Sequence, residues 1–209
     1  MTNSPSASPA AMDPEAFADL VRRTRSTRRF RQSEPVGMDV LDALADAARL
    51  TASGGNLQPL RYVLVNDPGT CAQVFATLGF AAYLSDWRGP EEGERPAAYI
   101  VMVKNPEAGA TPQTDAGIAA QTMLLAARTR GLGGCVFGAV NRKKLAAALN
   151  LGDAWDVMYV LALGVPAEEV RLEAVAADGE IRYWRDAQGV HHVPKRGLDE
   201  VVLARHVAK

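Results

Sequence analysis

Cysteine, histidine and aromatic residues are scarce in this chain of 209 residues. The two cysteines, Cys71 and Cys135, do not form a CxxC pair, and three histidines are too few for a Cys/His zinc module. We therefore expect no metal site. Both cysteines are expected to be small buried apolar side chains, the usual environment of a free cysteine, in a reducing compartment.

Long apolar runs and an excess of charge of one sign are also missing. No stretch reaches the roughly 18 to 20 apolar residues of a membrane-spanning helix, so we expect no membrane partner. The formal net charge of -1 argues against nucleic-acid binding through net charge. Residues 1–12 lack the basic and apolar regions of a secretory signal. We predict a disordered tail over 1–12, one domain over 13–209, and a cytoplasmic location.

Several catalytic and ligand-binding motifs do not occur. The run Gly131–Gly138 does not complete GxGxxG because Val136 holds the third glycine position, and neither GxxxxGK[ST] nor GxSxG is present. The neighbours His191 and His192 would point to opposite faces of a strand, so they are not expected to share a metal. The pair Glu168-Glu169 is expected to be solvated charge. We therefore expect no catalytic side chain of the nucleophile class.

Helical and strand periodicities alternate along the chain. Asp13-Pro14 predicts an N-cap followed by proline at the first helical position. The apolar spacing predicts helices over 14–24, 38–50, 112–130 and 141–149, one or two short helices over 70–89, and a helix from 198. Strands are predicted over 60–65, 97–103, 135–137 and 157–165, with a hairpin over 181–193. This interleaving favours a three-layer α/β/α arrangement.

Two short cationic segments are candidates for phosphate binding. In Arg25-Ser26-Thr27-Arg28 two guanidinium groups flank two hydroxyl groups, which suits a dianionic phosphate. Lys195-Arg196 is a second such pair near the C-terminus. Each segment alone is equally well explained as a solvated basic surface.

Two glycine-containing segments are candidates for contact with a flat ring. In the run 53–59, glycines permit close approach of the backbone, and the side chains of Asn56 and Gln58 can both donate to and accept from the edge of a heterocycle. In Gly131–Gly138, glycines after the long helix could let a ring lie against the backbone. A capped turn explains the first segment, and tight helix-to-strand packing explains the second, without any ligand.

The order of these four segments resembles that of the FMN-dependent nitroreductase family, from about Asp13 to Val202. The resemblance implies an α+β three-layer fold with a central mixed, mainly antiparallel sheet. It also implies a homodimer with FMN at the subunit interface. The cofactor-binding residues that it implies are Arg25, Ser26, Thr27, Arg28, Ser53, Gly54, Asn56, Gln58, Phe137, Gly138, Lys195 and Arg196. The 53–58 residues would reach the flavin from the neighbouring subunit.

The activity implied by the resemblance is reduction of nitro, quinone or similar electron-poor small molecules by NAD(P)H, in a ping-pong hydride transfer through flavin N5. Other reductive flavin chemistry (enone reduction, dehalogenation), cleavage of flavin itself, and non-catalytic flavin binding remain alternatives. Thr24, Ala52 and Leu60 depart from common family residues.

Two further expectations concern apolar side chains. Phe80, Tyr83 and Trp87 are candidates for a substrate pocket or lid, although their spacing also fits a helix stripe that faces the core. The helix middle over 118–127 has almost no charge. We expect it to be buried all round, partly in a dimer interface.

Overall fold

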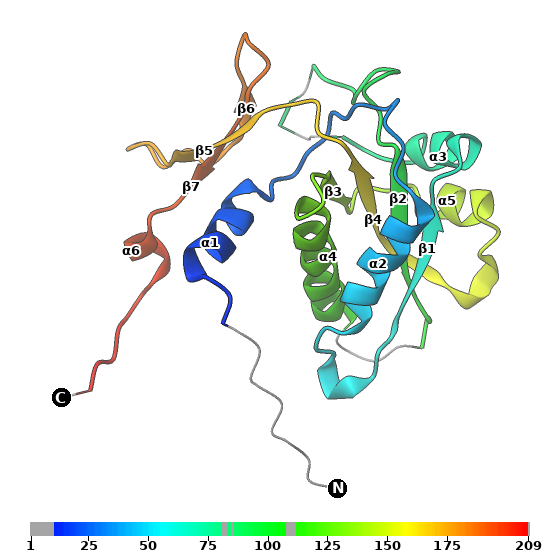
Figure 1. The fold of residues 1–209 in the computed structure, drawn as a ribbon, viewed down its shortest axis with the longest axis horizontal. Coiled ribbons are helices and arrows are strands. Elements are labelled where there is room, and N and C mark those ends of the chain that lie inside the picture. The colour runs from blue at the N-terminus through cyan, green and yellow to red at the C-terminus, as the bar shows by residue number, and fades with distance from the viewer. Residues whose placement is uncertain (1–10, 81–82, 85, 108–111, 209) are drawn as a thin grey trace, which may run out of the picture.

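A four-stranded antiparallel sheet forms the centre of the computed structural model (Figure 1). Its strands are β1 (Leu60–Val65), β2 (Ala98–Lys104), β3 (Gly133–Phe137) and β4 (Asp156–Gly164), in the order β1-β2-β4-β3. The structure describes residues 11–80, 83–84, 86–107 and 112–208, so most of the predicted tail over 1–12 lies outside the described residues.

Helices cover both faces of this sheet. On one face α2 (Met38–Arg49) and α4 (Pro112–Arg128) pack against side chains such as Ile100, and on the other α3 (Pro68–Phe75) and α5 (Arg142–Ala148) pack against Tyr99 and its alternating neighbours. Because both faces are covered, nearly every residue of β2 is buried. The predicted three-layer arrangement is confirmed.

The segments before and after this core lie to one side of it (Figure 1). The first helix, α1 (Pro14–Arg23), begins at the predicted N-cap, where the Asp13 carboxylate accepts a hydrogen bond from the Glu15 N–H at 3.1 Å. No residue of α1 is fully buried. After β4 come β5 (Val170–Ala174), β6 (Trp184–Arg185), β7 (His191–Lys195) and α6 (Leu198–Val201).

These late strands form a second sheet in the order β5-β7-β6. The strands β5 and β7 pair in parallel, while β6 and β7 form the predicted antiparallel hairpin. The strand β5 was not predicted, although Val170, Leu172 and Ala174 alternate with Arg171 and Glu173 as in a half-buried strand. Short 3-10 turns at η1 (Gly54–Asn56) and η2 (Gly152–Ala154) complete the described elements.

One prediction about helices is wrong. Over 70–89 the described residues are helical only as far as Phe75, so Phe80, Tyr83 and Trp87 do not form a helical stripe; residues 81, 82 and 85 lie outside the described part. In the single chain the middle of α4 is partly exposed, with Ile118 at 40%, so its predicted burial in a dimer interface stays a prediction. After α4 the chain turns at Gly131, whose left-handed φ of 76° is typical of the glycine that ends a helix.

Both cysteines are free and buried, as expected. Burial raises the pKa of Cys71 to about 11 and also raises that of Cys135, so both are neutral thiols. In the part of the chain that the structure describes, no helix is both long and apolar enough to cross a bilayer. The same residues contain no cluster of three or more side chains of the metal-binding types.

Candidate functional site

The segment Arg25–Arg28 runs along the start of β3. Ser26 forms a parallel bridge with Gly134, and the Thr27 N–H donates to the Gly134 carbonyl at 2.9 Å. A Cβ on Gly133 would lie 2.7 Å from the Thr27 hydroxyl oxygen, and one on Gly134 would lie 2.7 Å from the Ala162 carbonyl oxygen. Glycine at 133 therefore permits close packing of this segment on β3, and glycine at 134 permits close packing of β3 on β4 and α4.

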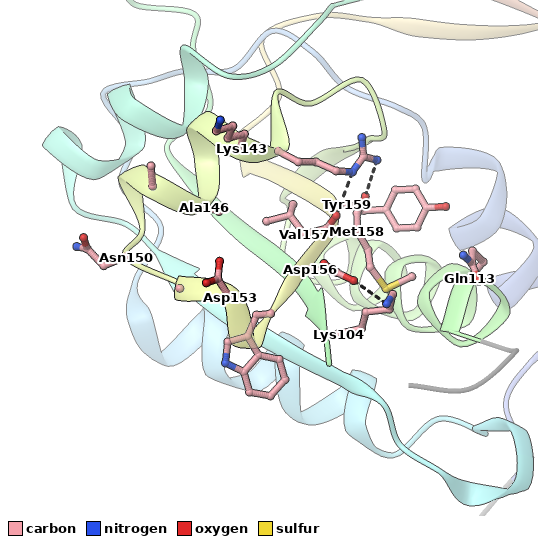
Figure 2. Close-up of a pocket in the computed structure, with 14 residues that line it drawn as sticks. Lys104, Gln113, Lys143, Ala146, Asn150, Asp153, Asp156, Val157, Met158 and Tyr159 are labelled. Atoms are coloured by element: carbon pink, nitrogen blue, oxygen red, sulfur yellow. Dashed lines mark hydrogen bonds and ion pairs between the residues drawn. The ribbon is translucent and has the colours of Figure 1, made fainter. Parts of the chain in front are cut away.

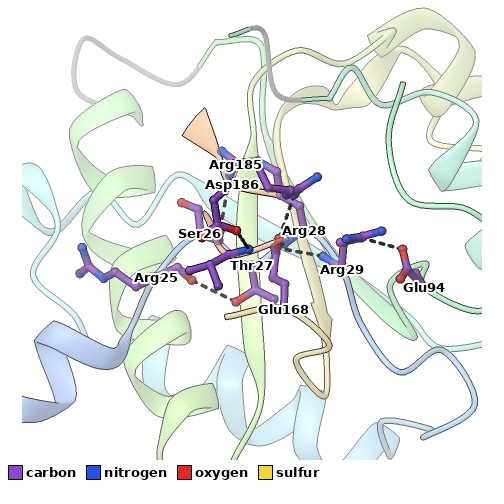
Figure 3. A network of polar contacts seen from close by, with 10 residues as sticks. Arg25, Ser26, Thr27, Arg28, Arg29, Glu94, Glu168, Arg185 and Asp186 are labelled. Carbon is purple, nitrogen blue, oxygen red and sulfur yellow. Dashed lines mark hydrogen bonds and ion pairs between the residues drawn. The ribbon is translucent and has the colours of Figure 1, made fainter. Parts of the chain in front are cut away.

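Successive side chains of this segment point in different directions. The Arg28 guanidinium lies 5.3 Å from the centre of the Tyr183 ring, on the side of the second sheet. The Arg25 side chain extends instead toward α1, where it donates to the Val21 carbonyl at 2.7 Å (Figure 3). Thr27 is buried. The four predicted phosphate contacts thus do not share one face, because extended backbone alternates its side chains.

Glu168 joins the two parts of the chain at this point. Its side chain is only 2% exposed, and its carboxylate accepts from the backbone N–H groups of Arg28 and Arg29 and from Arg185 at 3.0 Å (Figure 3). The expectation that Glu168 is solvated is therefore wrong. Its partners lie 140 residues earlier and 17 residues later in the chain, a separation that sequence spacing could not reveal.

The two neighbouring histidines of β7 have opposite environments. His191 is 1% exposed beside Tyr183, and burial lowers its pKa to about 4, with further lowering by the charges of Arg28 and Arg185. His192 lies on the other side, within 2.7 Å of a Glu173 oxygen and 3.0 Å of an Asp186 oxygen. Hydrogen bonds to these carboxylates raise the pKa of His192.

The predicted aromatic residues lie near the end of β3 but have different roles. Phe80 packs edge-to-face on the buried Phe137 ring, with 4.9 Å between the ring centres, so it belongs to the core. Trp87 lies beneath the Arg185 guanidinium at 4.6 Å, and Tyr83 lies against the Tyr183 ring at 5.0 Å. Tyr83 and Trp87 therefore contact the second sheet, on the same side as Arg28.

The exposed backbone of Gly138 follows β3 and is held from its carbonyl side by Arg142. The Arg142 guanidinium donates to the carbonyls of Gly138 and Met158 at 3.2 Å and of Val157 at 3.0 Å. One guanidinium thus donates hydrogen bonds to the carbonyl groups of β4 that lie beyond the end of β3. Sequence reasoning missed Arg142, and no local pattern marks it.

A cavity of about 790 Å³ lies next to Arg142 (Figure 2). Its walls carry positive charge from Lys104 and Lys143, an ion pair of 2.8 Å between Lys104 and Asp156, and the Tyr159 ring. The nearest atoms to a Cβ built on Gly138 belong to Tyr159, at 3.6 Å, so there is room beside this glycine.

The 53–58 loop lies at the other end of α4. Asp115, which is buried in the first turn of that helix, accepts from the Ser53 hydroxyl at 2.7 Å and from the Gly54 N–H at 3.1 Å. Asn56 and Gln58 are exposed and have left-handed φ values of 55° and 48°. The helix has 17 residues and is about 25 Å long, so this loop and Gly133 are far apart within one chain.

The predicted pair Lys195-Arg196 also stands apart. Both residues are exposed at the end of β7, four residues beyond His191, or about 13 Å along the strand. Arg196 forms an ion pair of 3.4 Å with Glu200 of α6. Among the described residues, no hydrogen bond or ion pair joins either side chain to the Arg25–Arg28 segment. One chain alone therefore does not bring the four predicted segments together.

Comparison with known proteins gives the chain its family. The model of the nitroreductase family matches residues 21–76 and 90–165, which is more than half of the chain. The chain belongs to the nitroreductase family. The matched residues include the Arg25–Arg28 segment, the 53–58 loop and the turn Gly131–Gly138, whereas Lys195-Arg196 lies outside them.

Three relatives show how far this nitroreductase-family likeness extends. The chain is 27% identical over 177 residues to the 5,6-dimethylbenzimidazole synthase of Rhodobacter capsulatus, covering 73% of this chain and 84% of that protein. It matches the structure of an FMN and NADPH-dependent nitroreductase mutant derived from sphigopyxis sp. strain HMH with a TM-score of 0.64 and 20% identity, covering 91% and 99% of the two chains. It matches an FMN-dependent nitroreductase from Clostridium difficile R20291 with a TM-score of 0.59 and 21% identity, covering 72% and 87%. The structural matches establish the fold.

Proposed function

We propose that the protein is an FMN-dependent oxidoreductase that uses NAD(P)H to reduce nitro compounds, quinones or similar electron-poor small molecules. The observation that carries this proposal is the meeting of Ser26 and Arg28 with β3, in the part of the chain that matches the nitroreductase family. Two structural relatives are named as FMN-dependent, and one of them as NADPH-dependent.

The donors at this place suit an anionic flavin nucleotide. Among the described residues, the Arg28 guanidinium has no carboxylate partner, since Glu168 accepts from the Arg28 backbone and from Arg185. Ser26 is exposed. A guanidinium without a carboxylate partner, beside a hydroxyl group, matches the oxygens of a phosphate or of a flavin ring edge.

Bound FMN would supply the two-electron chemistry, taking a hydride from NAD(P)H in one half-reaction and delivering it to the acceptor in the next. Arg28 would bind an anionic oxygen of the cofactor and stabilise negative charge that develops there. The exposed Gly138 backbone, fixed by Arg142, would present a main-chain group to the ring. Tyr83 and Trp87 would border the space for the acceptor. No side chain needs to form a covalent bond.

The site is completed by a second copy of the chain. The 53–58 loop lies about 25 Å from Gly133 along α4, so Ser53, Asn56 and Gln58 would serve the flavin of the partner. The exposed apolar side chains of α1, α4 and α6, among them Phe17, Ile118 and Leu198, provide surface for such a homodimer.

The test is reduction of the purified protein by nicotinamide cofactors without oxygen. We expect it to bind FMN, to lose absorbance near 450 nm when NADH or NADPH is added, and to recover that absorbance when a nitroarene or quinone follows. Arg28→Gln should weaken FMN binding about tenfold or more, the scale of a lost charge-assisted hydrogen bond. The matched control is Arg171→Gln, at an exposed arginine of β5. Failure of the wild type to take up FMN would refute the proposal.

A second candidate is a reaction in which the flavin itself is consumed, and the relative named 5,6-dimethylbenzimidazole synthase favours it. Admitting air to the reduced protein separates the two. An oxidoreductase regains its full flavin spectrum, whereas a flavin-cleaving enzyme loses it permanently. A protein whose flavin is never reduced by either nicotinamide cofactor is a non-catalytic binder.

A further inference from the structure

A second group of arginines lies on the face of the 25–28 segment that is opposite Arg28. Arg25 and Thr27 line a cavity of about 500 Å³ together with Arg23, Arg31 and Arg128, and residues 166–170 close its other side. Arg128 comes from the last turn of α4, so the cavity brings together three separate parts of the chain.

Two carboxylates also line this cavity, but both have partners of their own. Glu168 accepts from two backbone N–H groups and from Arg185, as described above. Glu169 accepts from Arg171 at 2.6 Å. The cavity is therefore not neutralised by its own acidic residues.

The arginines of the cavity differ in their partners. Arg23 forms an ion pair of 2.7 Å with Asp19, and Arg31 forms one of 3.1 Å with Glu34. Among the described residues, Arg25 and Arg128 have no carboxylate partner. The Nε atoms of both are buried without a hydrogen-bond partner.

A buried guanidinium nitrogen without a partner is costly, because folding has removed the water that would accept its hydrogen. Arg25 satisfies one terminal nitrogen at the Val21 carbonyl, but this neutral acceptor does not balance the charge. Burial also lowers the pKa of Arg25, and no acidic neighbour opposes that shift.

We propose that this cavity binds the phosphate group of a small molecule, held between Arg25 and Arg128. Two guanidinium groups supply the planar pairs of donors that match a phosphate dianion. The cavity exceeds the volume of a phosphate group alone, which leaves space for the organic part of a phosphate ester. The site is separate from the proposed flavin site, because Arg25 and Arg28 point to different sides of one extended segment.

The test is calorimetric titration of the full-length, FMN-saturated protein with inorganic phosphate at constant ionic strength. Arg25→Gln and Arg128→Gln should each weaken phosphate binding about tenfold, the scale of a lost charge-assisted hydrogen bond. Arg22→Gln is the matched control, because Arg22 belongs to the same helix end but faces Glu15 outside the cavity. It should bind phosphate like the wild type. Circular dichroism verifies that each variant is folded.

Two adenosine nucleotides distinguish the sources of the phosphate. Adenosine 2′,5′-bisphosphate carries the 2′-phosphate that separates NADPH from NADH, and adenosine 5′-monophosphate lacks it. If only the bisphosphate binds more tightly than inorganic phosphate, and loses that advantage in Arg25→Gln, the ligand is a nicotinamide dinucleotide phosphate. If neither nucleotide binds more tightly than inorganic phosphate, the site recognises the phosphate group and not an adenosine nucleotide.

Three results would overturn the proposal. The first is no measurable phosphate binding by the wild type, and the second is equal binding by the wild type, Arg25→Gln and Arg128→Gln. The third is a halved molecular mass of Arg25→Gln or Arg128→Gln in light scattering, with phosphate affinity unchanged. That result would show that the arginine contacts a partner chain and not phosphate. None of these results depends on flavin reduction, so the proposed oxidoreductase function is tested separately.

Discussion

The two ends of α4 carry the predicted site segments in very different states of assembly. At the C-terminal end, the Arg25–Arg28 segment, β3 and the second sheet meet within one chain and are joined by buried Glu168. At the N-terminal end, the 53–58 loop is fixed to the helix through Asp115, while Asn56 and Gln58 extend into solvent. One end is held together by contacts between distant parts of the chain, and the other by a single carboxylate.

This difference indicates where a second copy is needed. The C-terminal end already offers the Arg28 guanidinium and the Ser26 hydroxyl. The N-terminal end offers the exposed polar side chains of Asn56 and Gln58 on a loop that Asp115 fixes to the helix. Between the two ends, Ile118 leaves an apolar spot on the surface of α4. A homodimer that covers this strip would bring the loop of one protomer to the Arg28 end of its partner, which is the arrangement that we propose.

The largest expected effect comes from removing the carboxylate that joins the C-terminal end. Glu168→Ala leaves the buried Arg185 guanidinium and two backbone N–H groups without their acceptor, which should cost about 3–5 kcal/mol. The melting temperature should fall by about 10 °C. Glu169→Ala is the matched control, because its side chain is exposed, and should stay within about 0.5 kcal/mol. Equal melting temperatures for the two variants would show that Glu168 does not hold this end together.

A charge on the strip between the two ends tests the dimer. Ile118→Arg should produce a monomer in light scattering and weaken FMN binding at least about thirtyfold, the scale of a central interface contact. The control Ile181→Arg places the same charge at another exposed isoleucine, outside α4. A monomer that still binds FMN at wild-type affinity would show that each chain holds its flavin alone and would contradict the proposed role of the 53–58 loop.

A smaller effect is expected at the N-terminal end. Asp115→Asn removes the negative charge from the hydrogen bonds to Ser53 and Gly54, which should cost about 2 kcal/mol and loosen the loop. FMN titration of the dimer should show weaker binding, while Asp46→Asn, at an exposed ion pair of α2, should behave as the wild type. If stability falls and flavin affinity is unchanged, the loop is structural and does not reach the cofactor.

Local periodicity was sufficient for most of the fold. The strand predicted over 60–65 has those bounds in the structure, and the other central strands and α1, α2, α4 and α5 agree within two residues at nearly every end. These elements are specified by apolar spacing and by local caps such as Asp13 and Asn141, which act within a few residues. The helix predicted after Phe75 failed because aromatic spacing alone cannot separate a helix stripe from a loop that packs on Phe137.

The residues that fix the site could not be found in the same way. Glu168, Asp115 and Arg142 each contact at least one group 15 or more residues away, and each is an ordinary charged residue in its local sequence. The sequence identified the segments that a ligand would touch, through glycines and clustered donors. It did not identify the side chains that hold those segments, because their signal is tertiary.

The smallest expected effect is a pH dependence confined to the C-terminal end of α4. His191 is buried there beside Arg28, Arg185 and His192, and its pKa is lowered from 6.5 to about 4. As the pH falls below 6.5, this histidine becomes protonated in the unfolded chain, whereas in the folded protein it stays neutral until about pH 4. Stability should therefore decrease by an amount on the order of 1 kcal/mol between pH 7 and pH 5. His192 has a raised pKa, so its contribution to stability is complete below pH 6.5 and decreases only as the pH rises above that value.

Urea unfolding at pH 7 and pH 5 tests this prediction. The loss of stability at pH 5 should appear in the wild type and in His206→Leu, an exposed tail variant, but not in His191→Leu. An acid loss that persists in His191→Leu would place the titrating group elsewhere, and regional hydrogen exchange would then show whether the 53–58 end is responsible.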